Sequence, residues 1–197
     1  MYMNKNLEHY IFQKENFLDA QYCENSINVL IDENEWETHT WYHYRSDSIH
    51  EKSSAEPDQL SAPSFSDEVH VINQYIIDNL HSTILEYINT LKFKWFNEWQ
   101  GYNVLKFMRY SPGQTMENHC DHIHSMFDGE RKGIPILSII GVLNDDYEGG
   151  ELIMFDGDKT ISTKTGDLLI FPSNFLYPHR IAPVTRGARY SYVSWVW

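Results

Sequence analysis

The chain has 197 residues, of which 42% are hydrophobic and 22% charged, and this composition excludes an intrinsically disordered protein. Its length is that of one compact domain. The formal net charge of −13 argues against nucleic acids and anionic membrane surfaces as partners.

The sequence shows no feature of export or membrane insertion. No apolar run approaches the roughly 20 residues of a membrane span. The first residues do not combine a basic start with an apolar stretch. The two cysteines, Cys23 and Cys120, lack the paired spacing of a metal site, and we expect both to be reduced. These features together predict a cytoplasmic protein.

The first hundred residues favour helices. Asp19 is a typical N-cap for a helix from Ala20 to about Leu30. Residues 36–44 alternate like a strand, and the polar residues 45–65 predict a loop. Ser66, followed by two acidic residues, predicts the start of a longer helix. Its apolar residues recur every three or four positions, at Val69, Ile72, Ile76, Leu80, Ile84, Ile88 and Leu91.

From residue 102 onward, short runs rich in Val, Ile, Tyr and Trp alternate with turn residues. The runs cover residues 102–110, 134–143, 150–156, 168–172 and 189–197, with no helical pattern between them. This arrangement predicts an antiparallel sandwich or jelly roll. We therefore expect one mainly β domain over residues 1–197. In it, a double-stranded β-helix (jelly roll) of residues 102–197 is buttressed by a helical supporting layer of residues 1–100.

His119 and Asp121 form a His-x-Asp triplet, which on a strand would place both side chains on one face. Alone, the triplet carries little weight, because the ten His and thirteen Asp of this chain give about 0.7 such triplets by chance. His179 and Arg189 follow in the same strand-rich half. Two imidazoles and one carboxylate on one face can hold Fe(II) and leave three positions open, whereas a structural zinc site would be closed by a fourth ligand.

The order of these residues resembles the prolyl 4-hydroxylase branch of the Fe(II) and 2-oxoglutarate-dependent oxygenases. The similarity covers about residues 102–197. Its elements are Tyr110, Gly113 and Gln114, then His119 and Asp121, then Tyr-Glu-Gly-Gly-Glu-Leu at 147–152, then Gly-Asp-Leu-Leu-Ile-Phe-Pro-Ser at 166–173, then His179, and finally Gly-Ala-Arg-Tyr-Ser at 187–191. One departure is Met116, because many relatives have Tyr three residues before the first histidine.

The resemblance implies a role for each matched residue. His119, Asp121 and His179 would be the iron ligands and the core of the catalytic site. Arg189 would bind the distal carboxylate of 2-oxoglutarate, since a guanidinium pairs with a carboxylate bidentately. The hydroxyl of Tyr110 would join that carboxylate.

Further candidates come from position along the chain. On the last strand, Ser191 and Trp195 alternate to the same side as Arg189, which predicts a hydrogen bond from Ser191 and an apolar wall at Trp195 beside the metal. His122, His124 and Arg131 follow the ligands closely, and we expect them to face the substrate.

The implied activity is hydroxylation of a C–H bond, most simply of a prolyl residue in a peptide or protein. It would use Fe(II), 2-oxoglutarate and dioxygen, release succinate and CO₂, and depend on ascorbate as reductant. We expect the loops 45–65 and 125–135 to fold over the substrate. The first hundred residues hold 17 acidic and 6 basic residues, which favours a basic partner.

Two alternatives remain open at the level of sequence. A hydroxylase of free amino acids would use the same ligands. A non-catalytic, cupin-like jelly-roll binding protein would explain the six-residue spacings from Gly113 to His119 and from Gly166 to Pro172, although cupins usually have histidine where this chain has Asp121. The oligomeric state is not encoded in any of these patterns.

Overall fold

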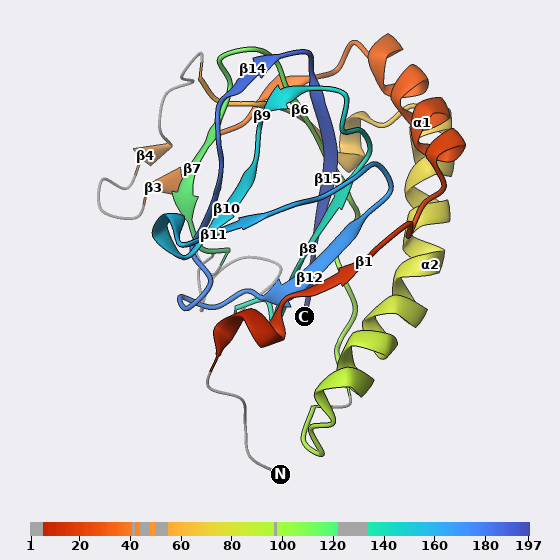
Figure 1. The fold of residues 1–197 in the computed structure, drawn as a ribbon. Coiled ribbons are helices and arrows are strands. Elements are labelled where there is room, and N and C mark those ends of the chain that lie inside the picture. Colours follow the sequence, from red (N-terminus) through yellow and green to blue (C-terminus); the bar gives the residue numbers. More distant parts are fainter. Residues whose placement is uncertain (1–5, 41, 44–47, 50–54, 97, 122–133) are drawn as a thin grey trace.

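The structure is a computed structural model that describes residues 6–40, 42–43, 48–49, 55–96, 98–121 and 134–197 (Figure 1). Within these residues, no helix combines the length and the apolar character that crossing a membrane requires.

Two α-helices begin at the predicted caps. Helix α1 spans Ala20–Asp32, and the carboxylate of Asp19 accepts a hydrogen bond from the Tyr22 amide at 2.8 Å. Helix α2 spans Asp67–Leu91, and the hydroxyl of Ser66 accepts one from the Val69 amide at 3.3 Å. Each cap satisfies an amide that has no partner inside the helix. The predicted apolar stripe of α2 is buried along its whole length.

A seven-stranded antiparallel sheet forms the centre of the molecule, and we call it the large sheet. Its strand order is β1 (Phe12–Lys14), β12 (Leu168–Pro172), β8 (Leu137–Val142), β15 (Arg189–Val196), β6 (Lys106–Tyr110), β5 (Asp58–Leu60) and β2 (Glu37–Thr38). Three of these strands come from the first hundred residues, so that part of the chain supplies sheet as well as helices.

A four-stranded antiparallel sheet, the small sheet, lies opposite. Its order is β11 (Lys159–Ile161), β10 (Leu152–Met154), β13 (His179–Ile181) and β7 (Met116–His119). Two further pairs are β14 (Val184–Arg186) with β9 (Glu148–Gly149), and β3 (Tyr42–His43) with β4 (Ser48–Ile49). Short 3₁₀ turns are η1 (Leu7–Tyr10), η2 (Ala62–Ser64) and η3 (Phe155–Gly157).

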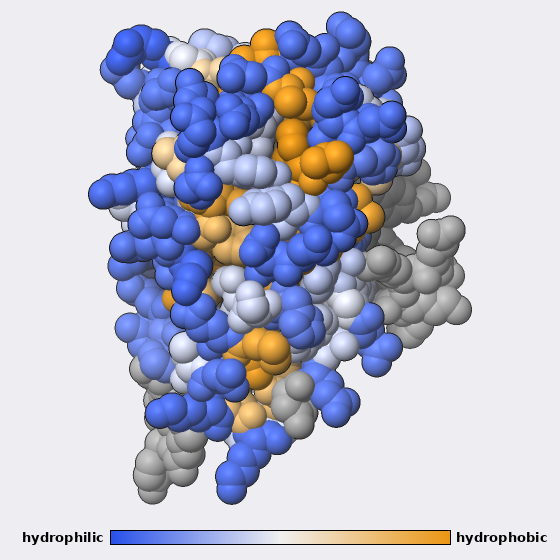
Figure 2. All heavy atoms as spheres, turned by 90° about the vertical axis from the view of Figure 1, so that its right-hand side faces the viewer, coloured by the Kyte–Doolittle hydropathy of each residue, from blue (hydrophilic) through white to orange (hydrophobic). Residues whose placement is uncertain are grey.

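The two faces of the large sheet bury two separate apolar cores. One core packs against α1 and α2, which lie along the same side of the molecule (Figure 1). The other fills the space between the two sheets, with residues such as Met108, Ile140 and Phe171 facing Leu152, Met154 and Ile181. The side of the molecule that the helices cover is mainly hydrophilic with apolar patches (Figure 2). Ile31 of α1 and Val71 of α2 are exposed apolar residues. The polar residues that lie between the two sheets are therefore the candidates for a functional site.

The structure corrects several predicted boundaries. The strand expected over 36–44 is only two residues long in the large sheet, at β2. Residues 58–60 of the expected loop 45–65 form β5, which pairs with β6 and was hidden by its polar composition. Strand β7 ends at His119, so Asp121 lies in the following turn and does not share a strand face with that histidine.

The Gly166–Asp167 pair joins the N-terminal segment to the large sheet. Gly166 has φ of +86°, and a Cβ there would lie 2.0 Å from the carbonyl oxygen of Leu18. The Asp167 carboxylate accepts hydrogen bonds from the Gln13 side chain at 2.9 Å and from the Asn16 amide at 3.1 Å. The Gly166–Asp167 part of the motif is therefore explained by the close packing of residues 13–18 against it.

We predict that Gly166→Ala destabilises the fold more than Gly113→Ala does. Both glycines have positive φ, +86° and +91°, and share the backbone cost of about 1–2 kcal/mol for an alanine there. A Cβ at Gly113 meets no atom within 4 Å, whereas at Gly166 it collides with backbone. Urea unfolding should show an additional loss of at least about 2 kcal/mol for Gly166→Ala. Equal losses of unfolding free energy in the two variants would contradict the close approach of Gly166 to the Leu18 carbonyl.

Candidate functional site

Three potential metal ligands converge at one end of the sandwich. His119 is the last residue of β7 and His179 the first residue of β13, and the two are direct cross-strand partners. Their ring centroids are 4.4 Å apart. One ligand atom each from His119, Asp121 and His179 lies within 4.8 Å of the others. This is the only such group of His, Cys, Asp or Glu among the described residues, and Cys120 is not part of it.

Backbone carbonyls orient both imidazoles. The Nδ1 of His119 lies 2.8 Å from the carbonyl oxygen of Glu117, and the Nδ1 of His179 lies 3.1 Å from that of Tyr177. A carbonyl oxygen can only accept, so each Nδ1 carries a proton and donates it to that carbonyl, and the other ring nitrogen of each imidazole is Nε2. Those Nε2 atoms face Asp121, at 3.4 Å and 3.9 Å from its carboxylate oxygens.

The charge states of the three groups suit a cation. Burial disfavours the charged form of Asp121, but His179, His119 and a hydrogen bond from Ser138 outweigh it and hold the pKa of this carboxyl below its usual range. Burial lowers the pKa of His179, although Asp121 opposes the shift. At neutral pH the site therefore presents an ionised carboxylate and a neutral imidazole, the forms that bind a metal.

Ser138 anchors Asp121 to the large sheet. Its hydroxyl donates to Asp121 Oδ2 at 2.5 Å and lies 2.8 Å from the hydroxyl of Ser173. Because Ser138 has one hydroxyl proton, Ser173 must be the donor in the second bond. Sequence reasoning missed Ser138, although a serine inside the apolar run of residues 134–143 was a usable signal.

Arg189 lies deep in the space between the sheets, with 2% of its surface exposed. Its Nη1 donates to Ser191 Oγ at 2.6 Å, and the guanidinium carbon lies 5.2 Å from the centroid of the Tyr110 ring. The Nε atom has no partner, and no carboxylate within the described ranges forms an ion pair with this guanidinium. A buried charge without a counter-ion is costly, which makes this arrangement fit an anionic ligand.

Tyr110 and Gly150 lie close to the side chain of Arg189. Burial raises the pKa of Tyr110 to about 12, against the opposing effect of Arg189, so its hydroxyl stays protonated. Gly150 has φ of +67°, and a Cβ there would lie 3.2 Å from the Cδ of Arg189. The lack of a side chain at Gly150 thus lets the backbone pass close to the side chain of Arg189.

The remaining predicted residues lie in different places. Trp195 is the cross-strand partner of Ser138 and lies on the same face of the large sheet. Met116 is buried between the sheets. The candidates His122, His124 and Arg131, most of the segment 125–135 and parts of the loop 45–65 lie outside the described residues.

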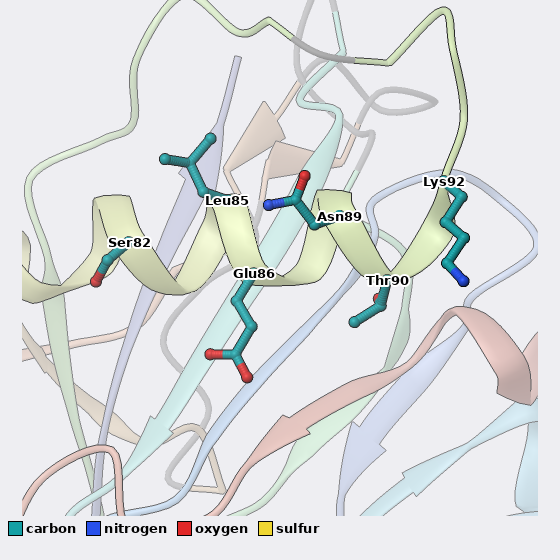
Figure 3. A pocket seen from close by; sticks show the side chains of 6 residues that line it. All are labelled: Ser82, Leu85, Glu86, Asn89, Thr90 and Lys92. Carbon is teal, nitrogen blue, oxygen red and sulfur yellow. The ribbon is translucent and has the colours of Figure 1, made fainter.

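The surface hollow along α2 does not bring metal-binding or charged groups together in this way. A hollow of about 600 Å³ follows the outer side of α2 and includes Leu85, Glu86 and Asn89. Figure 3 shows that its side chains diverge, with Leu85 and Asn89 on one side of the helix and Glu86 on the other. Glu86 is already paired with Lys14 at 2.7 Å. The convergent residues of the sandwich are therefore the better candidate site.

Comparison with known proteins shows which proteins this chain is similar to. Residues 105–197 match the model of the 2OG-Fe(II) oxygenase superfamily. A PKHD-type hydroxylase of Delftia acidovorans is 33% identical over 145 residues, which cover 69% of this chain and 58% of that protein. A PKHD-type hydroxylase of Xylella fastidiosa is 52% identical over 96 residues, 41% of this chain and 40% of that protein. The chain spans about half the length of the curated relatives that it matches.

Solved structures share the fold at low sequence identity. A Pseudomonas putida prolyl-4-hydroxylase has a TM-score of 0.64 at 20% identity, covering 95% of this chain and 92% of that one. A Trichoplax adhaerens prolyl hydroxylase, solved with a peptide fragment of hypoxia inducible factor, has a TM-score of 0.68 at 17% identity, covering 96% and 84%. These structures share the fold of this chain, and the part of the chain that matches the 2OG-Fe(II) oxygenase superfamily model, residues 105–197, contains all three potential metal ligands and Arg189.

Proposed function

We propose that the chain is a 2-oxoglutarate-dependent dioxygenase that hydroxylates a C–H bond of a prolyl residue in a peptide or protein, with release of succinate and CO₂. One observation carries the proposal: three metal-binding side chains converge in the same sandwich that buries the uncompensated charge of Arg189. The two sheets would then be the jelly roll of such enzymes. Residues 102–197 would form its catalytic core, supported by residues 1–100.

His119, Asp121 and His179 would hold the metal through two Nε2 atoms and one carboxylate oxygen. This donor set fits Fe(II), because three ligands on one face leave positions for a cosubstrate and dioxygen. Bound Fe(II), with 2-oxoglutarate and dioxygen, supplies the oxidising chemistry, and ascorbate would keep the metal reduced. The protein orients these groups and excludes water, since His179 is 4% exposed.

Arg189, Ser191 and Tyr110 would bind the distal carboxylate of 2-oxoglutarate. The guanidinium supplies two nearly parallel N–H donors, one of which now uses Ser191 as acceptor. The protonated hydroxyl of Tyr110 adds a neutral donor. Binding the cosubstrate would thus satisfy the arginine Nε that lacks a partner among the described residues.

A prolyl substrate is supported by the relatives. The Pseudomonas putida and Trichoplax adhaerens structures are prolyl hydroxylases by their descriptions, and the second holds a peptide fragment. The prediction of a basic partner, made from the acidic first hundred residues, remains a prediction.

The primary test is metal-dependent release of succinate from 2-oxoglutarate. We expect the wild-type protein to release succinate slowly without substrate, only with Fe(II), and His179→Ala to lose at least about 100-fold of this activity. His81→Ala, on the exposed face of α2, is the matched control and should keep full activity. Succinate release that survives a chelator, or full activity in His179→Ala, would contradict the proposal.

Ser138→Ala should weaken metal binding. Loss of its hydrogen bond raises the pKa of Asp121, so protons compete with the metal at higher pH than in the wild type. We expect about tenfold lower affinity for Mn(II) by titration calorimetry, and a larger deficit as pH falls. Ser194→Ala removes an equally buried hydroxyl that bonds only the Asn103 carbonyl, and should leave affinity unchanged. Equal affinities in the two variants would rule out the anchoring role.

Arg189→Lys should weaken binding of 2-oxoglutarate while preserving charge. A lysine cannot offer two parallel donors from one planar group, and we expect about a tenfold higher Kd in the presence of Mn(II). The control is Arg186→Lys at an exposed arginine that pairs with Glu148. An unchanged Kd in Arg189→Lys would show that the guanidinium does not bind the cosubstrate.

A further inference from the structure

Lys106 is a cation on the metal-facing side of the large sheet that none of the proposed roles uses. It is the first residue of β6 and the cross-strand partner of Val193 in β15. The same register pairs Tyr110 with Arg189. Because side chains of directly paired residues lie on one face, Lys106 faces the small sheet as Arg189 does.

The two cations lie at opposite ends of this face. Lys106 and Tyr110 are four residues apart, which is about 13 Å along a strand. Lys106 is at the end where Asp121 is held: its Nζ lies 5.9 Å from the ring centroid of Trp195, and Trp195 pairs with the Ser138 that bonds Asp121. Lys106 therefore lies beside the Asp121 anchor, on β6, and along the strands it is two residues closer to Arg189 than Ser138 is.

Electrostatic effects agree with this placement. Burial lowers the pKa of Lys106, and the negative charge of Asp121 opposes that shift. Lys106 in turn helps to lower the pKa of His39, which also responds to His119. Lys106 is thus close enough to the ligands to act on whatever binds beside them.

Lys106 has no anion of its own in the described part of the chain. Its ammonium forms no ion pair or hydrogen bond there, while the more exposed Lys14 and Lys159 pair with Glu86 and Glu8. Both oxygens of Asp121 are directed elsewhere, toward Ser138 and the two imidazoles. The partly buried ammonium of Lys106 contacts the ring face of Trp195 and can still bind an anionic group.

Counting formal charges indicates the sign of that partner. Among the metal, its ligands, 2-oxoglutarate and Arg189, the two positive charges of the metal and the one of Arg189 would balance Asp121 and the two carboxylates of 2-oxoglutarate, while Glu56 acts on Tyr110 at the Arg189 end. The positive charge of Lys106 would then be left over. An incoming group with one negative charge would complete the balance.

We propose that Lys106 binds a carboxylate of the substrate and so sets the substrate class: a prolyl compound with a carboxylate next to the ring. This inference rests on the hydroxylation chemistry of the proposed function, and it includes free proline because the sequence left a hydroxylase of free amino acids open. The carboxylate has two possible sources, the α-carboxylate of free proline or the side chain of an acidic residue that follows proline in a peptide.

The test uses pairs of probes that differ only in that charge. L-proline is compared with L-prolinamide, and acetyl-Pro-Asp-amide with acetyl-Pro-Asn-amide. Binding is measured by calorimetry with Mn(II) and 2-oxoglutarate, where no turnover occurs, and hydroxylation is measured with Fe(II). We expect the wild type to prefer the acid member of at least one pair about tenfold in Kd and in kcat/KM. The pair that shows the preference identifies the source.

Variants at Lys106 assign the preference to this residue. Lys106→Met should remove the preference and leave the affinities for the amide member and for 2-oxoglutarate within about twofold of the wild type. Lys106→Arg should retain part of the preference, because it keeps the charge. Lys164→Met, at an exposed lysine, should behave like the wild type.

The opposing outcomes are distinct. Equal binding of acid and amide, binding of neither, or a preference that survives in Lys106→Met overturns the inference. A Lys106→Met protein with weakened 2-oxoglutarate binding would place Lys106 at the cosubstrate, and equal losses for acid and amide would show a structural role. Succinate release without substrate is measured in parallel, since its absence would overturn the proposed function itself.

Discussion

The cross-strand pairing of His119 with His179 is the constraint on which the site depends. Each histidine is at one end of its strand, and the pairing alone brings two residues sixty positions apart to within 4.4 Å between ring centroids. The backbone carbonyl two residues earlier then orients each ring. Antiparallel pairing and one hydrogen bond per ring thus place and orient both imidazoles.

The third potential ligand, Asp121, is oriented by a residue of the opposite sheet. Asp121 has left the strand, and its orientation depends on a hydroxyl of β8 in the large sheet. The spacing between the two sheets therefore determines the geometry of the triad, and the apolar core between them sets that spacing. The Gly166–Asp167 pair attaches the N-terminal segment to the start of β12. Strand β12 in turn pairs with β8, the strand that carries Ser138.

Local patterns were sufficient for the elements that carry strong signals. The two helix caps and the stripe of α2 are confirmed, and each of the five runs predicted after residue 102 contains a strand, since capping and periodicity depend on neighbouring residues. Strands β7, β9, β11, β13 and β14 were not predicted, and two of them carry the histidines. Strand β5 was missed because its Asp-Gln-Leu sequence has no strand pattern, and only pairing with β6 makes it one. The roles of the site residues remain predictions, but the order of motif residues did select three side chains that the structure brings together.

Lys106 shows why the rest was not predictable. Arg189 stands within a motif and attracts attention in the sequence, whereas Lys106 is one lysine in a run of strand residues. Its importance appears only when the register of β6 against β15 places it opposite Val193, on the same face as the arginine. A face with two separate cations, one of them beside the residues that hold Asp121, distinguishes two carboxylate ligands by position. The end at Arg189 suits the distal carboxylate of the cosubstrate, and the end at Lys106 is left for the molecule to be oxidised.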